Sequence, residues 1–187
     1  MKYRLPLFFL LLAIYSAGFA QIGPEREHRI KRSQFPMVAA GTVPNEAKNI
    51  KYYREIDSSK ITYILKFRLK KMDYHLDLDK LGQIQQIGFR VKEVDIPQDT
   101  YAQISNFLED RFQMAKIRRM LHYYPGNSDN VLKNAYQNLI LPNNTYQILF
   151  RGKEGRERKE YLATFDAEGN IVNIRVALPA NYDHILY

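Results

Sequence analysis

The chain has 187 residues, carries a formal net charge of +8 and contains no cysteine. The absence of cysteine excludes disulfides, thiol catalysis and cysteine metal sites, so a packed core must supply the stability. The basic excess favours acidic partners or surfaces, although net charge governs solubility and encounter rather than fold.

The beginning of the sequence, residues 1–20, has the pattern of a secretory signal peptide. Lys2 and Arg4 precede an apolar run, and the small residues Gly18 and Ala20 precede a cleavage point before Gln21. No later apolar run approaches the roughly 20 residues that a membrane helix needs. We therefore expect a periplasmic or secreted protein without a transmembrane segment in its mature chain.

A polar, irregular segment at 21–46 follows, in which a short helix could begin after Pro24. Four segments with an alternation of apolar and polar residues come next, and such alternation is typical of half-buried strands. Together they predict an antiparallel meander with one buried face. The predicted strands cover 47–56, 61–69, 74–79 and 82–91.

The strongest helix signal lies at 97–112. Pro97 suits a first helical position, and Tyr101, Ile104, Leu108 and Phe112 recur at helical spacing. Strand patterns then resume, interrupted by an insertion at 126–143 that could hold a short helix. The predicted segments are strands at 115–124 and 145–150, a charged hairpin at 151–159, two strands joined by a turn in the stretch 161–174 and a final short helix at 178–187.

One phrase, Y-x-x-x-x-D-x-x-G-x-I-x-x-I, occurs twice, at 74–87 and at 161–174. Asp79 and Asp166 end their strands, where a carboxylate can accept hydrogen bonds from backbone N–H groups further along the turn. Gly82 and Gly169 can adopt the positive φ that a short hairpin requires. The two isoleucines stand three apart in both copies, which breaks the alternation and predicts a β-bulge.

The alternative interpretation of the phrase is a cation site at Asp77 and Asp79. The second copy has Thr164 in place of Asp77, and the run lacks the several oxygen ligands that calcium takes. The sequence therefore favours a structural turn and no metal.

A wider resemblance joins these features. The chain resembles the PepSY-like, β-lactamase-inhibitor-like proteins exported by Bacteroidetes-type bacteria. The resemblance is carried by the repeated phrase, the helix after Pro97, Phe35-Pro36, Ala47-Lys48 at the start of a strand and the spacing Tyr63-x-x-x-Phe67. The resemblance covers roughly 35–187. It implies an α+β fold of two tandem units, each a four-stranded antiparallel sheet with a packed helix. The units would span 47–94 and 95–187, the second including the helix 97–112 and the insertion 126–143.

Catalytic motifs are missing from the sequence. It contains no H-E-x-x-H, G-x-S-x-G, S-x-x-K, G-x-G-x-x-G or phosphate-loop pattern. Paired carboxylates far apart in the chain could still form a hydrolase site, but no acidic residue stands in an apolar setting that would tune it. We expect a protein that is not an enzyme and uses no cofactor.

The open face of the sheet, opposite the packed helix, is the predicted functional surface. Tyrosine and arginine are enriched among the residues that dominate protein interfaces. The sequence thus predicts a non-catalytic exported binding protein, an inhibitor or regulator of another exported or envelope protein. The alternatives are an envelope component that binds an anionic glycan or lipid surface and, below it, a hydrolase with an unrecognised site; nucleic acid is not an expected partner. The predicted partner-binding residues are Tyr53, Lys66, Arg68, His75, Arg118, His122, Tyr124 and Arg151.

Overall fold

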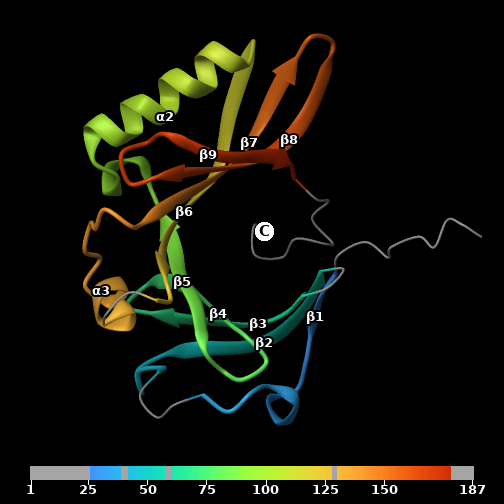
Figure 1. Ribbon diagram of the computed structural model, residues 1–187, viewed down its shortest axis with the longest axis vertical. Helices are drawn as coiled ribbons and strands as arrows, with labels where there is room; N and C mark the ends of the chain where they lie inside the picture. Colours follow the sequence, from blue (N-terminus) through green and yellow to red (C-terminus); the bar gives the residue numbers. More distant parts are fainter. Residues whose placement is uncertain (1–25, 39–41, 58–59, 128–129, 178–187) are drawn as a thin grey trace, which may run out of the picture.

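The computed structural model describes residues 26–38, 42–57, 60–127 and 130–177. The predicted signal peptide and the predicted helix at 178–187 lie outside the described residues. In these described ranges, nine strands form one sheet in which spatial order equals chain order and every neighbouring pair is antiparallel (Figure 1). The strands are β1 (Arg26–Arg29), β2 (Lys48–Asp57), β3 (Lys60–Leu69), β4 (Met72–Leu78), β5 (Ile84–Val91), β6 (Met114–Pro125), β7 (Thr145–Glu154), β8 (Glu157–Asp166) and β9 (Ile171–Val176).

Within the described part of the chain, two α-helices and two 3-10 helices accompany the sheet. α2 (Gln98–Arg111) follows Pro97 and buries Ile104 and Leu108 against the sheet. α3 (Val131–Tyr136) falls in the predicted insertion and contacts β5 and β6. The 3-10 helices are η1 (Arg32–Gln34) and η2 (Glu93–Asp95).

The expectation of two tandem sheet-and-helix units is wrong. β5 pairs directly with β6 over six residue pairs from Gln86↔Pro125 to Val91↔Met120, so all nine strands form one continuous sheet. In place of a helix, residues 30–38 and 42–47 pack on the first strands, with Phe35 against Tyr52 and Tyr63. The predicted short helix in 21–46 is replaced by β1 and η1, because this polar segment has no apolar stripe to bury.

One face of the sheet, here called the outer face, carries the main core. Alternate residues such as Phe67, Leu76, Phe89 and Phe165 are buried there, together with the apolar sides of α2 and α3. Figure 1 shows the sheet bending, with β2–β4 at one end of the molecule, β7–β9 at the other and β5 and β6 between them. The opposite, inner face is therefore concave, and neither described helix packs on it.

The two copies of the repeated phrase form equivalent turns. Asp79 Oδ1 accepts hydrogen bonds from the N–H groups of Leu81 (2.8 Å) and Gln83 (2.9 Å). Asp166 Oδ1 accepts from Glu168 (3.0 Å) and Asn170 (2.8 Å) in the same way. These bonds close the β4–β5 and β8–β9 hairpins.

The turn glycines have positive φ, +79° at Gly82 and +91° at Gly169. Each also lies against the segment that covers the outer face. A Cβ at Gly82 would stand 2.4 Å from the carbonyl oxygen of Met37, and one at Gly169 would stand 2.6 Å from that of Thr100. The repeated phrase thus places a covering segment on each hairpin: residues 30–38 cover the β4–β5 hairpin, and α2 covers the β8–β9 hairpin.

Bulges interrupt the ladder where the isoleucine spacing predicts them. The register shifts beside Asp77 in the β4–β5 pair and beside Thr164 in the β8–β9 pair. A third bulge lies in β6, between Ile117 and Arg119. Because bulges bend strands, they contribute to the curvature that makes the inner face concave. Among the described residues, no helix is long and apolar enough to cross a membrane.

Candidate functional site

The first half of the inner face contains a basic hollow of about 320 Å³, here called the cationic cavity. Alternate side chains of β2 to β6 line it, so the pleat of the sheet brings together residues far apart in sequence. Among the described residues that line it, Asp73 alone carries a carboxylate. The cationic side chains of the cavity are Lys51, Lys66, Arg68, Arg90 and Arg119.

Four of the predicted binding residues meet in this cavity. Tyr53 is half-buried, and its ring lies 4.4 Å from Lys66 Nζ in a cation–π contact. Arg68 is exposed and pairs with Asp73, with 3.6 Å between Nε and Oδ1. His75 pairs across the ladder with Lys66 and completes the group.

His75 forms part of the cavity floor and is only 7% exposed. Burial, together with the positive charges of Lys66 and Arg119, lowers the pKa of His75 to about 3. The ring is therefore neutral at physiological pH. Its Nδ1 atom is buried and has no hydrogen-bond partner in the described structure.

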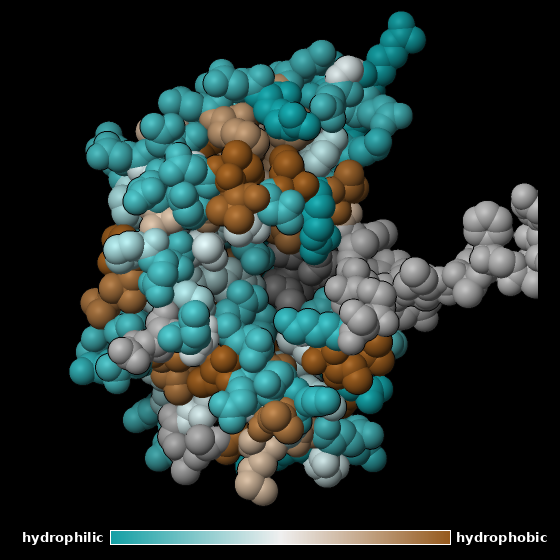
Figure 2. All heavy atoms as spheres, viewed as in Figure 1, coloured by the Kyte–Doolittle hydropathy of each residue, from teal (hydrophilic) through white to brown (hydrophobic). Residues whose placement is uncertain are grey.

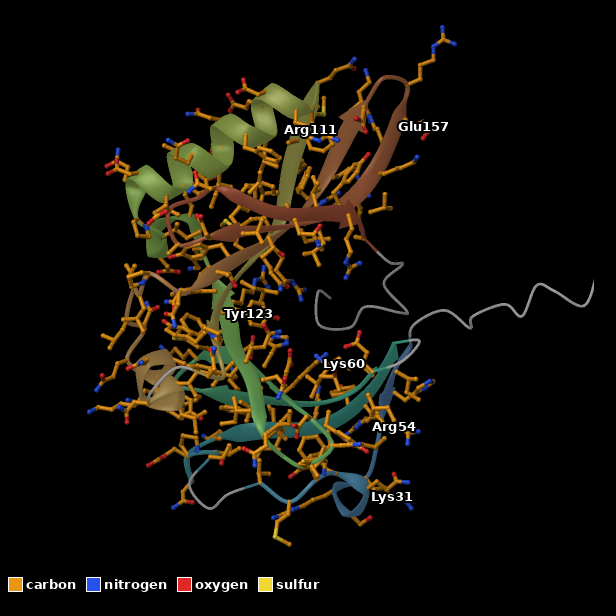
Figure 3. The ribbon with its side chains drawn as sticks, in the orientation of Figure 1. Lys31, Arg54, Lys60, Arg111, Tyr123 and Glu157 are labelled. Carbon is orange, nitrogen blue, oxygen red and sulfur yellow. The ribbon has the colours of Figure 1, made fainter. Side chains whose placement is uncertain are left out.

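Next to His75 the face becomes aromatic and apolar. Gly88 pairs with His75 on one side and Tyr123 on the other, and a Cβ at Gly88 would stand 2.4 Å from the Tyr123 ring. Tyr123 therefore lies flat over a glycine that leaves room for it. Figure 3 shows Tyr123 near the middle of the curved sheet. A small buried cluster lies on this part of the face and consists of Leu121, Tyr123, Leu149 and Leu162.

His122 and Tyr124 do not belong to the inner face, and the expectation that they point outward is wrong. Both are 1% exposed and lie in the core behind the sheet. The β6 bulge adds a residue at Arg118, so the alternation changes phase and the even-numbered positions after it face the core. The inner face receives Arg119, Leu121 and Tyr123 instead.

The buried His122 is held by a polar network. Asn144 Nδ2 donates to His122 Nε2 at 2.8 Å, and the Tyr124 hydroxyl donates to the carbonyl oxygen of Leu139 at 2.8 Å. The His122 ring also stacks on Tyr146, with centroids 4.7 Å apart. Burial lowers the pKa of His122 to about 4, so this ring too is neutral at physiological pH.

Arg118 and Arg151 come together away from the cationic cavity. Both line a smaller basic hollow of about 160 Å³ with Lys116, Lys153 and Arg158. Arg151 pairs with Glu160, with 3.5 Å between Nη2 and Oε1. The predicted binding residues therefore divide between two basic hollows and the core.

Sequence reasoning missed Arg90 and Arg119 as cavity residues. Arg90 could have been found, because it is the polar position between Phe89 and Val91 in an alternating strand. Arg119 could not, because the bulge that turns it inward leaves no distinct pattern in Ile117-Arg118-Arg119. Among residues 26–38, 42–57, 60–127 and 130–177, no group of three or more histidine, aspartate or glutamate side chains is placed to hold a metal ion.

Figure 2 shows a largely hydrophilic surface, interrupted by apolar clusters. No protein-family model matches this sequence, and no curated protein matches it. Among solved structures, a DUF2874 family protein from Bacteroides uniformis is similar, with a TM-score of 0.49 and 13% identity. The match covers 70% of this chain and 78% of that protein's chain. At this level of structural and sequence similarity, the likeness gives no information about function.

Proposed function

We propose that the protein is an exported, non-catalytic binding protein that inhibits or regulates another exported or envelope protein. The supporting observation is the cationic cavity, where five cationic side chains and one carboxylate line a single hollow on a concave face. Complementary charge favours a partner that presents an acidic surface there. Export is part of the proposal and rests on the signal-peptide pattern in residues 1–20.

Tyr53 and Tyr123 add features that protein interfaces use. An aromatic ring contributes contact area at low entropic cost, and arginine and tyrosine dominate interface hot spots. A concave surface also fits a protruding loop of a partner better than a flat membrane. Kinship with the PepSY-like, β-lactamase-inhibitor-like proteins is part of the same proposal and is supported by the repeated phrase at 74–87 and 161–174.

A second candidate function is attachment to an anionic glycan or lipid surface. The observation that favours it is the second basic hollow around Arg118 and Arg151, which extends the positive charge along the molecule. Such binding would depend on total charge, weaken steeply with salt and tolerate single substitutions.

The test compares two triple variants of equal net charge. Lys66→Gln/Arg90→Gln/Arg119→Gln removes charge from the cavity, and Lys31→Gln/Arg111→Gln/Arg156→Gln removes it elsewhere. Proteins captured from envelope extract are identified, purified and titrated by calorimetry against both variants. We expect the cavity variant to bind at least about 10-fold more weakly, since interface hot spots carry 2 kcal/mol or more, and the control to bind within about twofold of the parent.

Equal binding by both variants and the parent would overturn the proposal. Equal weakening of both variants, together with binding to vesicles of anionic lipid or to acidic polysaccharide, would favour the second candidate. Circular dichroism of each variant establishes that the fold is retained.

A further inference from the structure

We propose that the cationic cavity is a binding site for one compact oxyanion, a carboxylate or a phosphate group, held by Lys66, Arg90 and Arg119 above the His75 ring. The inference rests on the proposed function and deepens it, because it names the chemical group that the partner presents.

The first support is a pairing of like charges. Lys51 and Lys66 stand directly opposite each other in the β2–β3 ladder, so both side chains lie on the inner face. Like charges in opposed positions destabilise a sheet. Arg90 and Arg119 add two further cations to the same hollow, and among the described residues that line it Asp73 alone carries a carboxylate. An oxyanion bound in this hollow would be attracted by each of these cations.

The second support is His75, whose buried Nδ1 has no hydrogen-bond partner in the described structure. A buried polar atom without a partner is costly and uncommon in native proteins. A neutral imidazole can present N–H at Nδ1, and an oxygen of a bound carboxylate or phosphate would supply the missing acceptor. The low pKa of His75 means that its ring, which forms the floor of the cavity, stays uncharged beside the cationic side chains.

The third support is the match of size and geometry. A hollow of about 320 Å³ accepts a small group or one side chain and is too small for a folded surface. Arginine presents a planar fork of N–H donors that fits carboxylate and phosphate oxygens. With the Tyr53 ring holding Lys66 in place, the cavity has both a charged wall and an ordered rim.

The experiment titrates the purified exported protein with sodium acetate and, separately, with sodium phosphate, at constant pH and with sodium chloride holding the ionic strength constant. Two-dimensional NMR follows the backbone signals of β4–β6 and the ring nitrogens of His75. We expect saturable shifts at these positions with at least one of the two anions. Saturation by acetate alone assigns a carboxylate, and saturation by phosphate alone assigns a phosphate group.

Variants locate the site. Arg90→Gln and Arg119→Gln should each weaken anion binding by about 10-fold, as the loss of a charge-assisted hydrogen bond implies. His75→Phe keeps a ring without nitrogen and should weaken it by about fivefold, which corresponds to about 1 kcal/mol for one neutral hydrogen bond. Arg156→Gln, in the exposed β7–β8 turn, should change it by less than about twofold.

Absence of saturable shifts with both anions overturns the proposal, and so does equal weakening by Arg90→Gln and Arg156→Gln. Arg90 is exposed, so its variant remains informative if His75→Phe fails to fold. Partner binding without anion binding would retain the proposed function and reject the subsite. Anion binding that a captured partner does not compete with would retain the subsite and reject the proposed function.

Discussion

His75 and His122 are both buried histidines, but they have different surroundings. His122 accepts a hydrogen bond from Asn144 and stacks between aromatic rings on the outer-face side of the sheet. His75 faces Lys66 from β3 and Arg119 from β6, and Asp77 lies two residues along its own strand. The first ring completes a core, whereas the second forms the floor of a charged hollow.

The two histidines predict how stability changes with pH. Their folded-state pKa values, about 3 for His75 and about 4 for His122, lie below the ordinary value of 6.5. The unfolded chain therefore binds protons first, so stability is complete above pH 6.5 and falls as the pH drops toward 4. Each histidine contributes up to about 1.4 kcal/mol per pH unit in this window.

Urea unfolding at pH 7, 6 and 5 measures this dependence, with NMR of the histidine rings to read their protonation. We expect a falling unfolding midpoint while the signals of both rings stay in the neutral form. The dependence should shrink in His122→Gln, although that variant is less stable at every pH because it loses the ring that stacks on Tyr146. A midpoint that does not change between pH 7 and 5 would contradict the prediction.

At the level of elements, hairpins and bulges give the sheet its shape. The β4–β5 and β8–β9 hairpins share a carboxylate-bonded turn, a glycine and a bulge, and each is covered by a segment packed on its glycine. The β6 bulge has a different consequence. It moves Arg119 to the inner face and His122 to the core, and thereby decides which residues line the cationic cavity.

The turn glycines give a stability prediction with a control built into the chain. Gly169→Ala should cost about 1 kcal/mol for positive φ and more for the displaced Thr100 carbonyl, a total above about 2 kcal/mol. Gly155 also has positive φ, +61°, but no neighbouring atom would meet its Cβ. Gly155→Ala should therefore cost only the conformational part, about 1 kcal/mol.

Denaturant unfolding of the two variants measures the difference. Gly82→Ala should behave like Gly169→Ala, because the Met37 carbonyl lies equally close. If Gly155→Ala proves as destabilising as the other two, the covering segments do not pack against the turns as described.

For the whole molecule, the consequence of the continuous sheet is one shared core. Aromatic contacts run across the centre from Tyr74 to Phe89, from Phe89 to His122 and from His122 to Tyr146. α3 reinforces this connection, since Tyr136 contacts Tyr74 and its hydroxyl donates to the Thr42 carbonyl at 2.7 Å. The two ends of the sheet should therefore unfold together.

Phe112→Ala tests this cooperativity. Phe112 packs on Phe150 and Tyr161 at 5.0 and 4.9 Å between ring centroids, so its loss should cost about 3–5 kcal/mol. In one cooperative unit, hydrogen exchange should accelerate in β3 and β4 as well as in β7 and β8. Leu81→Ala, at an exposed position in the β4–β5 turn, is the control and should leave exchange unchanged. Acceleration confined to β6–β9 would show that the two ends unfold separately.

Local features of the fold follow from local sequence. The alternation in Tyr63, Leu65 and Phe67 and the helical spacing of Ile104 and Leu108 predict the elements because each pattern reports which side must be buried. The turn at Asp79 and Gly82 is similarly determined, since its hydrogen bonds and positive φ involve only neighbouring residues. Four cavity residues, Tyr53, Lys66, Arg68 and His75, were predictable on the same basis.

Tertiary structure alone decided the rest. Whether β5 pairs with β6 depends on which strand edges find each other, and no local pattern encodes that choice. The bulge beside Arg118 depends on pairing with β7, so the burial of His122 and Tyr124 and the inward position of Arg119 could not be read from one strand. The sequence by itself determined the strands, the turns and the surplus of positive charge. The long-range pairing of the strands determined where that charge gathers, because only pairing sets the register and therefore the face on which each side chain lies.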